Sequence, residues 1–196
     1  VDLHCDTISE IYKNKGISLK ENDLMIDINK LKKSDVLLQC FAMFTYLKEV
    51  DSPYKYVNEL IDLYEDEIEK NSSDIAFAKS YSDIQKNKEN NKISAFLTIE
   101  EGEAIEGSIE NLIHFYNRGV RMITLTWNFE NCIGFGNKRI IENGECVGYT
   151  PDKVNGLKPF GFEVVEKMEE LGIIVDVSHL SDAGIYDIID IAKKPF

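Results

Sequence analysis

The sequence has no apolar run approaching the length of a membrane span, and acidic residues outnumber basic ones. Its 196 residues include 22 lysines and arginines against 35 aspartates and glutamates, a formal net charge of −13. Nucleic acids and anionic membranes are bound through basic surfaces, so this balance disfavours both as partners. A composition of 43% hydrophobic and 29% charged residues is typical of a soluble globular protein.

Cysteine motifs and a secretory leader are also missing. None of the four cysteines forms a CxxC pair, and Cys5 and Cys40 lie in apolar runs typical of reduced, buried thiols. No basic segment followed by an apolar stretch and a small-residue cleavage site opens the chain. These features predict a cytoplasmic protein. The sequence leaves its oligomeric state open, and a homo-oligomer is kept among the expected assemblies.

Only three histidines occur, and the first lies in the apolar opening run 1–8. If this run is a strand, Asp2, His4 and Asp6 share one face, since successive side chains point to opposite faces. Imidazole and carboxylate on one face can bind the same divalent cation. The alternative is a strand end whose polar residues simply meet solvent. The opposite face, which carries Val1, Leu3 and Cys5, is expected to be packed.

Strand-like and helix-like patterns alternate along the rest of the chain. Strands are predicted at residues 36–44, 92–99, 120–126 and 173–177, with Gln39 the one polar residue inside the first. Helices are predicted at residues 53–68, 108–119, 159–171 and 181–192. The second of these helices has the apolar stripe Ile109, Leu112, Ile113 and Tyr116, and the last is expected to bury Ile185, Ile188, Ile189 and Ala192.

Alternating strands and helices indicate a parallel sheet, because each crossover helix returns the chain to the same edge. No glycine-rich phosphate fingerprint follows the first strand, which disfavours a dinucleotide-binding sheet. We therefore expect an α/β fold, a (β/α)8 TIM-type barrel of the metal-dependent hydrolase type. About five β/α units are legible, in a single incomplete barrel domain over residues 1–196. Segment 128–157 is expected to be a functional βα loop, and 86–92 a charged turn facing water.

Two more polar residues follow predicted strands at their carboxyl ends, where barrel enzymes place their chemistry. Glu100 ends the strand at 92–99, and His179 follows the strand at 173–177. In a closed barrel they would converge with His4 and Asp6. Taken singly, Glu100 could be a solvated acid and His179 a neighbour of a helix cap. His114 falls inside a predicted helix and is interpreted as a surface or packing residue.

Several blocks resemble the renal (membrane) dipeptidase family of zinc peptidases, in its bacterial type. They occur in family order and cover almost the whole chain: Asp2–Thr7, Leu97–Gly102, Gly119–Asn128, Gly156–Gly161 and Leu171–Ser181. The resemblance implies a (β/α)-barrel with two zinc ions and the hydrolysis of dipeptides, including those with a D-configured C-terminal residue. It further implies that His4 and Asp6 bind one ion, that Glu100 bridges both, and that His179 binds the other.

In such a site Glu100 would also orient the water that attacks the peptide bond. Asp2 and Asp176 are candidates for orienting the metal-bound imidazoles, although a core role is equally open to them. Where some relatives have a substrate-contacting histidine, this chain has Trp127, which would offer an aromatic wall instead. The native ion could equally be manganese or cobalt.

The sequence stops at Phe196, where the family enters its next strand. We therefore interpret it as a C-terminally incomplete chain, inactive by itself, whose second metal site is weak because Glu100 and His179 leave it short of ligands. Two alternatives stay open. One is another barrel hydrolase, acting on a phosphoester or cyclic amide, for which Arg121 and Arg139 are the only nearby phosphate ligands. The other is a non-catalytic scaffold.

Overall fold

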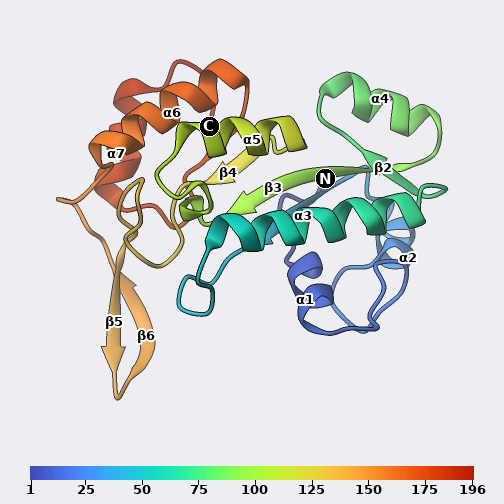
Figure 1. Ribbon diagram of the computed structural model, residues 1–196, viewed down its shortest axis with the longest axis horizontal. Helices are drawn as coiled ribbons and strands as arrows, with labels where there is room; N and C mark the ends of the chain where they lie inside the picture. The colour runs from blue at the N-terminus through green and yellow to red at the C-terminus, as the bar shows by residue number, and fades with distance from the viewer.

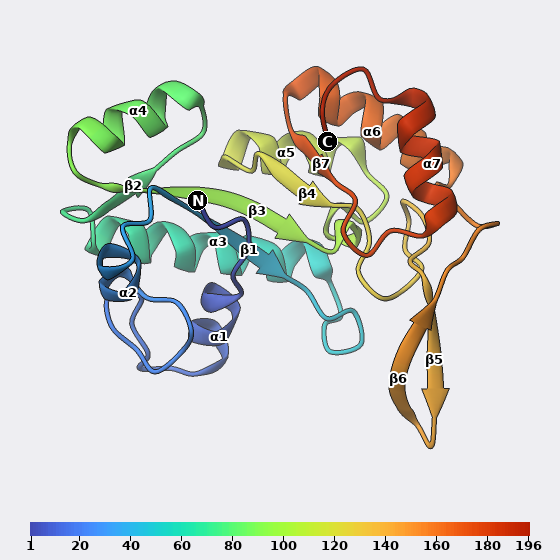
Figure 2. The same cartoon turned by 180° about the vertical axis from the view of Figure 1, so that it is seen from behind.

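A parallel sheet runs through the middle of the computed structural model, which describes residues 1–196 (Figures 1 and 2). Strands β1 (Leu38–Phe44), β3 (Ile93–Glu100), β4 (Met122–Thr124) and β7 (Ile174–Asp176) follow one another across it, and β2 (Ile75–Phe77) pairs with the start of β3. All these pairs are parallel. Their register places Glu100 beside Thr124 and Thr124 beside Asp176, so the strands present their carboxyl ends along one edge.

Helices connect these strands, as the alternating pattern predicts. They are α1 (Thr7–Lys13), α2 (Ile28–Lys33), α3 (Pro53–Lys70), α4 (Tyr81–Glu89), α5 (Ile109–Arg118), α6 (Pro159–Leu171) and α7 (Asp182–Ile191), with a short 3-10 helix at Gly102–Ile105. The four predicted helices correspond to α3, α5, α6 and α7. Ser52, Ser108 and Ser181 cap three of them by accepting a hydrogen bond from a first-turn amide.

The core lies between the sheet and the helices that pack on it. Thirty-three buried apolar residues form one contiguous cluster, and β1 and β3 are buried on both faces, as a covered parallel sheet requires. In Figure 1 the long helix α3 lies in front of β3. None of the helices combines the length and the apolar character needed to cross a bilayer.

The opening run is not the strand that its alternation predicts. It runs beside β1 only through a bridge between Asp2 and Gln39 and a hydrogen bond from the Ala42 amide to the Cys5 carbonyl, and helix α1 already begins at Thr7. Cys5 is buried, but Val1 and Leu3 are 75% and 64% exposed. The expectation of a packed apolar face is therefore wrong for these two residues, because no element of the chain covers them.

Two helix faces also differ from the predicted stripes. In α5 the buried residues are Leu112 and Phe115, whereas Ile113 lies on the exposed side. In α7 Ile188 is fully buried, but Ile189 is 55% exposed. In each case a helix with several isoleucines allows more than one apolar face, and packing against the sheet selects one of them.

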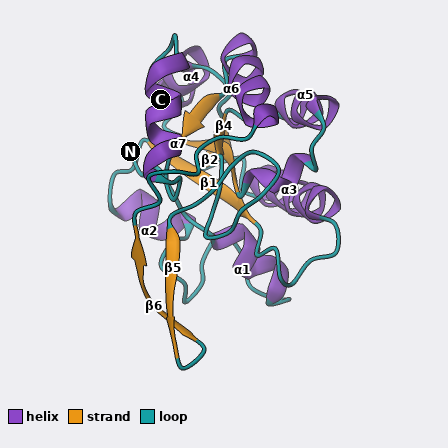
Figure 3. Cartoon of the chain, turned by 90° about the vertical axis from the view of Figure 1, so that its left-hand side faces the viewer, coloured by secondary structure: helices purple, strands orange, loops and turns teal.

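The segment predicted as a βα loop, 128–157, does connect β4 to α6, and it contains a hairpin that was not predicted. Strands β5 (Lys138–Glu142) and β6 (Glu145–Thr150) pair in antiparallel fashion and project away from the body of the molecule (Figure 3). The expected water-facing turn at 86–92 is largely the end of α4, and Asn87 is buried there, where its amide donates to the carbonyls of Ala76 and Phe77. The exposure expected for 86–92 is found at residues 86 and 88–91, whereas the helical turn and the buried Asn87 were not predicted.

Candidate metal centre

Two side chains of the opening run meet a third, distant in sequence, at the carboxyl edge of the sheet. The ligand atoms of His4, Asp6 and Glu100 all lie within 4.8 Å of one another. His4 Nε2 is 3.2 Å from Asp6 Oδ1 and 3.3 Å from Glu100 Oε2. Asp6 occupies the position that precedes α1, yet its side chain makes no capping hydrogen bond. Its carboxylate is therefore free to face His4.

The second oxygen of Glu100 faces the other predicted histidine. His179 Nε2 is 3.4 Å from Glu100 Oε1, so one carboxylate contacts two imidazoles, each through a different oxygen. Glu100 is buried at the end of β3, whereas His4 and His179 are partly open to solvent. The structure thus brings together all four residues named from the sequence, with Glu100 between the two histidines.

The charges around His4 favour a cation at this point. Hydrogen bonds that the protonated imidazole donates to the carboxylates of Asp6 and Glu100, partly opposed by burial, raise the pKa of His4 to about 10. A divalent cation would satisfy the same two carboxylates and would compete with protons for the imidazole. Imidazole and carboxylate are the donors that zinc and its neighbours bind. The residues present therefore fit a metal ion.

Two residues at these ligands have an uncommon backbone conformation. Glu101 and His179 both have positive φ angles, 86° and 66°, which are uncommon for residues with side chains and often occur at functional sites. At Gly136 an added Cβ would lie 2.7 Å from the Trp127 carbonyl oxygen and 3.2 Å from that of His179. A glycine is therefore required here, because the hairpin base packs directly on the backbone that carries His179.

Glu101 has a structural role that the sequence does not reveal. Its side chain is fully buried, and it accepts hydrogen bonds from the amides of Glu103 and Trp127 and from Asn131 Nδ2. Burial raises the pKa of Glu101, although these hydrogen bonds oppose the shift. This carboxylate therefore anchors the loop after β4 directly beside the metal ligands.

Trp127 lies in that loop, within a group of aromatic rings. Its ring centroid is 5.1 Å from Phe44, 5.6 Å from Tyr46 and 5.8 Å from Phe129. The imidazole of His179 is 6.2 Å away. An apolar wall thus borders the candidate metal centre on the side of His179.

Asn128 is a further residue that sequence reasoning missed. Its Oδ1 lies 3.3 Å from His179 Nδ1, so the imidazole donates from Nδ1 and leaves Nε2 free toward Glu100. Such hydrogen bonds fix the tautomer and orientation of metal-binding histidines. In the sequence Asn128 stands out only by its position directly after Trp127. A lone asparagine has no spacing pattern that would mark it as a partner of His179.

The two candidate supporting aspartates do not contact an imidazole. Asp2 Oδ1 accepts from the backbone amide of His4, whereas Asp176 accepts from Thr124 Oγ1 and the Ser178 amide. The suggestion that they orient the imidazoles is therefore wrong, and their hydrogen bonds instead hold the backbone near the ligands. His114 packs against Tyr54 and Phe115 and contacts Asn58 Oδ1, which confirms its interpretation as a packing residue.

Comparison with known proteins identifies a family over the full length. Residues 1–196 match the model of the membrane dipeptidase family, peptidase family M19. A curated relative, an uncharacterised dipeptidase of Schizosaccharomyces pombe, is 31% identical over 180 residues, which is 86% of this chain and 41% of the relative. The chain therefore spans less than half of the length of that relative.

Solved structures show the same fold. A metallopeptidase from Rhodobacter sphaeroides, bound to a phosphinate mimic of the dipeptide L-Ala-D-Ala, superposes with a TM-score of 0.87 at 18% identity, covering 99% of this chain and 62% of its own. A second metallopeptidase of family M19, dipeptidase AC, gives a TM-score of 0.83 at 19% identity, and the match covers 97% of this chain and 59% of that protein. The fold is thus the predicted α/β barrel type, present here as part of a barrel.

Proposed function

Because this chain belongs to the membrane dipeptidase family, peptidase family M19, we propose that its parent protein is a zinc-dependent dipeptidase whose metal ligands include His4, Asp6, Glu100 and His179. The contact of the single Glu100 carboxylate with two imidazoles, through one oxygen each, carries this proposal. A carboxylate in that position is suited to bridge two cations. The Rhodobacter relative, solved with an L-Ala-D-Ala mimic, supports dipeptides as substrates, including those with a D-configured C-terminal residue.

Each residue of the site would have its own role in the hydrolysis. When bound, the ions would acidify a water molecule and polarise the peptide carbonyl group. Glu100 would orient the attacking water by accepting its hydrogen bond, since its carboxylate lies between the two histidines. His4 and Asp6 hold the exposed side of the site, and the ring of Trp127 would contact an apolar part of the dipeptide next to His179.

The two metal positions are expected to differ in affinity. His4, Asp6 and Glu100 supply three ligands to one position, whereas the described contacts give the other only His179 and Glu100. Three protein ligands are typical of a catalytic zinc ion, and two leave its coordination incomplete. We propose zinc as the native ion, although manganese or cobalt would suit the same donors.

Zinc titration of the chain and a hydrolysis assay of the full-length protein test this function. Calorimetry is expected to show one tight site and one weaker site, and the full-length enzyme should hydrolyse dipeptides only when zinc is present. A zinc-loaded full-length protein that leaves a panel of L,L- and L,D-dipeptides intact would refute dipeptidase activity. Two tight, equivalent sites in the chain alone would contradict the ligand assignment.

Replacing Asn128 by alanine is expected to lower zinc affinity at the weaker site. Loss of a hydrogen bond that orients a metal-binding imidazole typically costs about 10–100-fold in metal affinity. The Asn128→Ala chain should therefore bind its second zinc ion more weakly, while the His4 site keeps its affinity. Asn137→Ala is the control, because Asn137 lies in the same loop but accepts hydrogen bonds from the amides of Asp152 and Asp182. Calorimetry of the two variants separates the effect on His179 from a general disruption of the loop. Equal weakening of both sites in Asn128→Ala would contradict the orienting role.

The two alternative functions have weaker support. A phosphoester hydrolase would need free cations near Glu100, but Arg121 precedes β4 at the opposite end of the strand and donates to the carbonyls of Lys79, Tyr116 and Val120. Arg139 stacks on Phe129. A scaffold without catalysis has no physical reason to bring four metal-binding side chains together.

All four cysteines are free, which supports the further proposal of a reducing, cytoplasmic location.

A further inference from the structure

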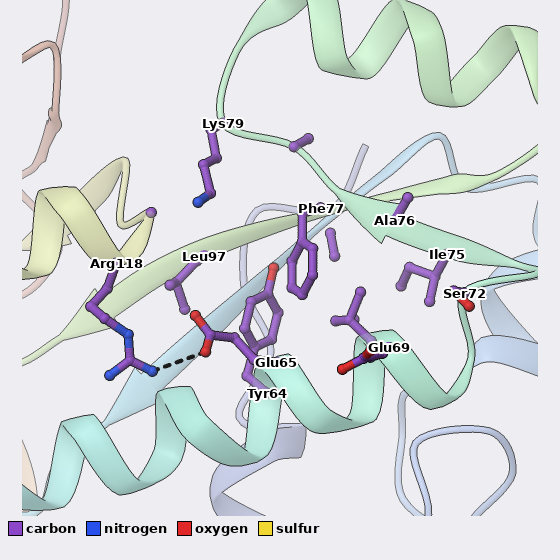
Figure 4. Close-up of a pocket in the computed structure, with 14 residues that line it drawn as sticks. Tyr64, Glu65, Glu69, Ser72, Ile75, Ala76, Phe77, Lys79, Leu97 and Arg118 are labelled. Carbon is purple, nitrogen blue, oxygen red and sulfur yellow. Dashed lines mark hydrogen bonds and ion pairs between the residues drawn. The ribbon is translucent and has the colours of Figure 1, made fainter.

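A cavity of about 470 Å³ opens on the face of β3 that is turned away from the metal ligands. It lies between α3 and the strands β2 and β3, and Ile68, Ile75, Phe77 and Leu97 line its apolar part (Figure 4). Side chains alternate along a strand, so Leu97 and Glu100 point to opposite faces of β3. The cavity is therefore separate from the candidate metal centre, and its volume is in the range of small-molecule sites.

Tyr64 contributes a hydroxyl to this cavity. The residue is only 2% exposed, its ring packs edge-on against Phe77 at 5.6 Å, and no protein group is hydrogen-bonded to its hydroxyl. This hydroxyl is therefore available to a molecule that enters the cavity. Burial raises the pKa of Tyr64 well above its usual value, so the hydroxyl remains a donor. In Figure 4 it points into the cavity.

Lys79 adds a cation at the mouth of the same cavity. Its backbone is held by Asp83 and Arg121, and its side chain crosses Gly119, where an added Cβ would lie 2.6 Å from Lys79 Cε. No carboxylate lies within ion-pairing distance of its amine. The neighbouring Arg118 is different, because it is already paired with Asp62 and Glu65. Lys79 is thus the uncommitted cation of the cavity.

We propose that this cavity binds a small monocarboxylate with an apolar body. Its carboxylate would accept hydrogen bonds from the Tyr64 hydroxyl and the Lys79 amine, and its apolar part would cover Ile68, Phe77 and Leu97. Glu69, which lines the cavity without an ion pair, disfavours a second negative charge on the ligand. The ligand therefore carries one carboxylate and no further anion.

Binding of octanoate to the 196-residue chain tests this site, with octylamine and octanol as probes of equal chain length but different head groups. In amide correlation spectra, octanoate is expected to shift the signals of Phe77 and Leu97 in a saturable way, and the other two probes are expected to bind much more weakly. Octanoate that shifts neither signal, or octylamine that binds as well as octanoate, would overturn the proposal.

Two conservative variants locate the carboxylate. Tyr64→Phe removes only the hydroxyl, and Lys79→Met removes only the charge, so each is expected to raise the Kd for octanoate about tenfold, as loss of a charge-assisted hydrogen bond does. Lys33→Met, at an exposed lysine of α2 that also lacks an ion pair, serves as the control and should bind normally. If either cavity variant binds octanoate like the Lys33→Met chain, the proposed site is wrong.

Discussion

Glu100→Gln is expected to lower the zinc affinity of the chain by more than about a hundredfold, because even the loss of a supporting hydrogen bond costs about 10–100-fold. Glutamine is neutral, and its amide group offers one acceptor oxygen where the carboxylate offers one to each histidine. Both metal positions should therefore weaken together. In the full-length protein the same substitution should abolish dipeptide hydrolysis. Calorimetry and a hydrolysis assay measure the two effects.

Glu163→Gln provides the matched control for this experiment. Glu163 is an exposed carboxylate of α6 without an ion pair, so the substitution removes the same charge from the molecule at a site away from the ligands. Its zinc affinity and activity should stay at the wild-type level. If the Glu100→Gln enzyme turns dipeptides over at the same rate as the control, Glu100 has no part in the mechanism.

Glu101→Ala is expected to destabilise the fold by about 1–3 kcal/mol, as leaving buried hydrogen-bond donors without an acceptor does. The substitution leaves the amides of Glu103 and Trp127 and the side chain of Asn131 without their acceptor. Because the Trp127 loop loses its anchor, the fluorescence of this single tryptophan should move toward that of a solvent-exposed ring. Urea unfolding followed by circular dichroism measures the stability change, with Glu163→Ala expected to stay within about 0.5 kcal/mol of wild type.

The pH dependence of this change has a defined sign. Burial raises the pKa of Glu101 in the folded state, so the folded protein favours the protonated form. Its stabilising contribution is then largest below the unfolded pKa and decreases as the pH rises through the folded value. The stability difference between wild type and Glu101→Ala should therefore be greater at acid pH than at neutral pH. A difference that grows steadily toward alkaline pH would show that the carboxylate prefers its charged form in the fold.

Local signals in the sequence predict much of the scaffold. Ser52 with Pro53 marks the start of α3, and Ser108 and Gly119 bracket α5, because capping is decided by residues close in sequence. Glu100 could be placed at the carboxyl edge because it ends an apolar run of strand length. The expectation that distant ligands converge then followed from the predicted barrel, which brings the carboxyl ends of its strands together.

The sequence-based predictions fail where contacts between distant elements decide which side chains are buried. Alternation at Val1 and Leu3 resembles a half-buried strand, but the pattern does not say whether another element covers that face. In the sequence Glu101 is one of several neighbouring glutamates, and only its complete burial against Asn131 distinguishes it. The hairpin is different, because it has a local signal: Asn143 and Gly144 form a two-residue turn with positive φ angles, and Asn-Gly is the commonest sequence for such a turn.

Anomalous diffraction at the zinc edge, from crystals of the zinc-soaked chain, tests the central assignment most directly. The strongest peak is expected within about 2.0–2.2 Å of both His4 Nε2 and a Glu100 carboxylate oxygen, with Asp6 as a further ligand and a weaker peak beside His179. A strongest zinc peak that touches neither His4 nor Glu100 would contradict the assignment of this edge of the sheet as a metal centre.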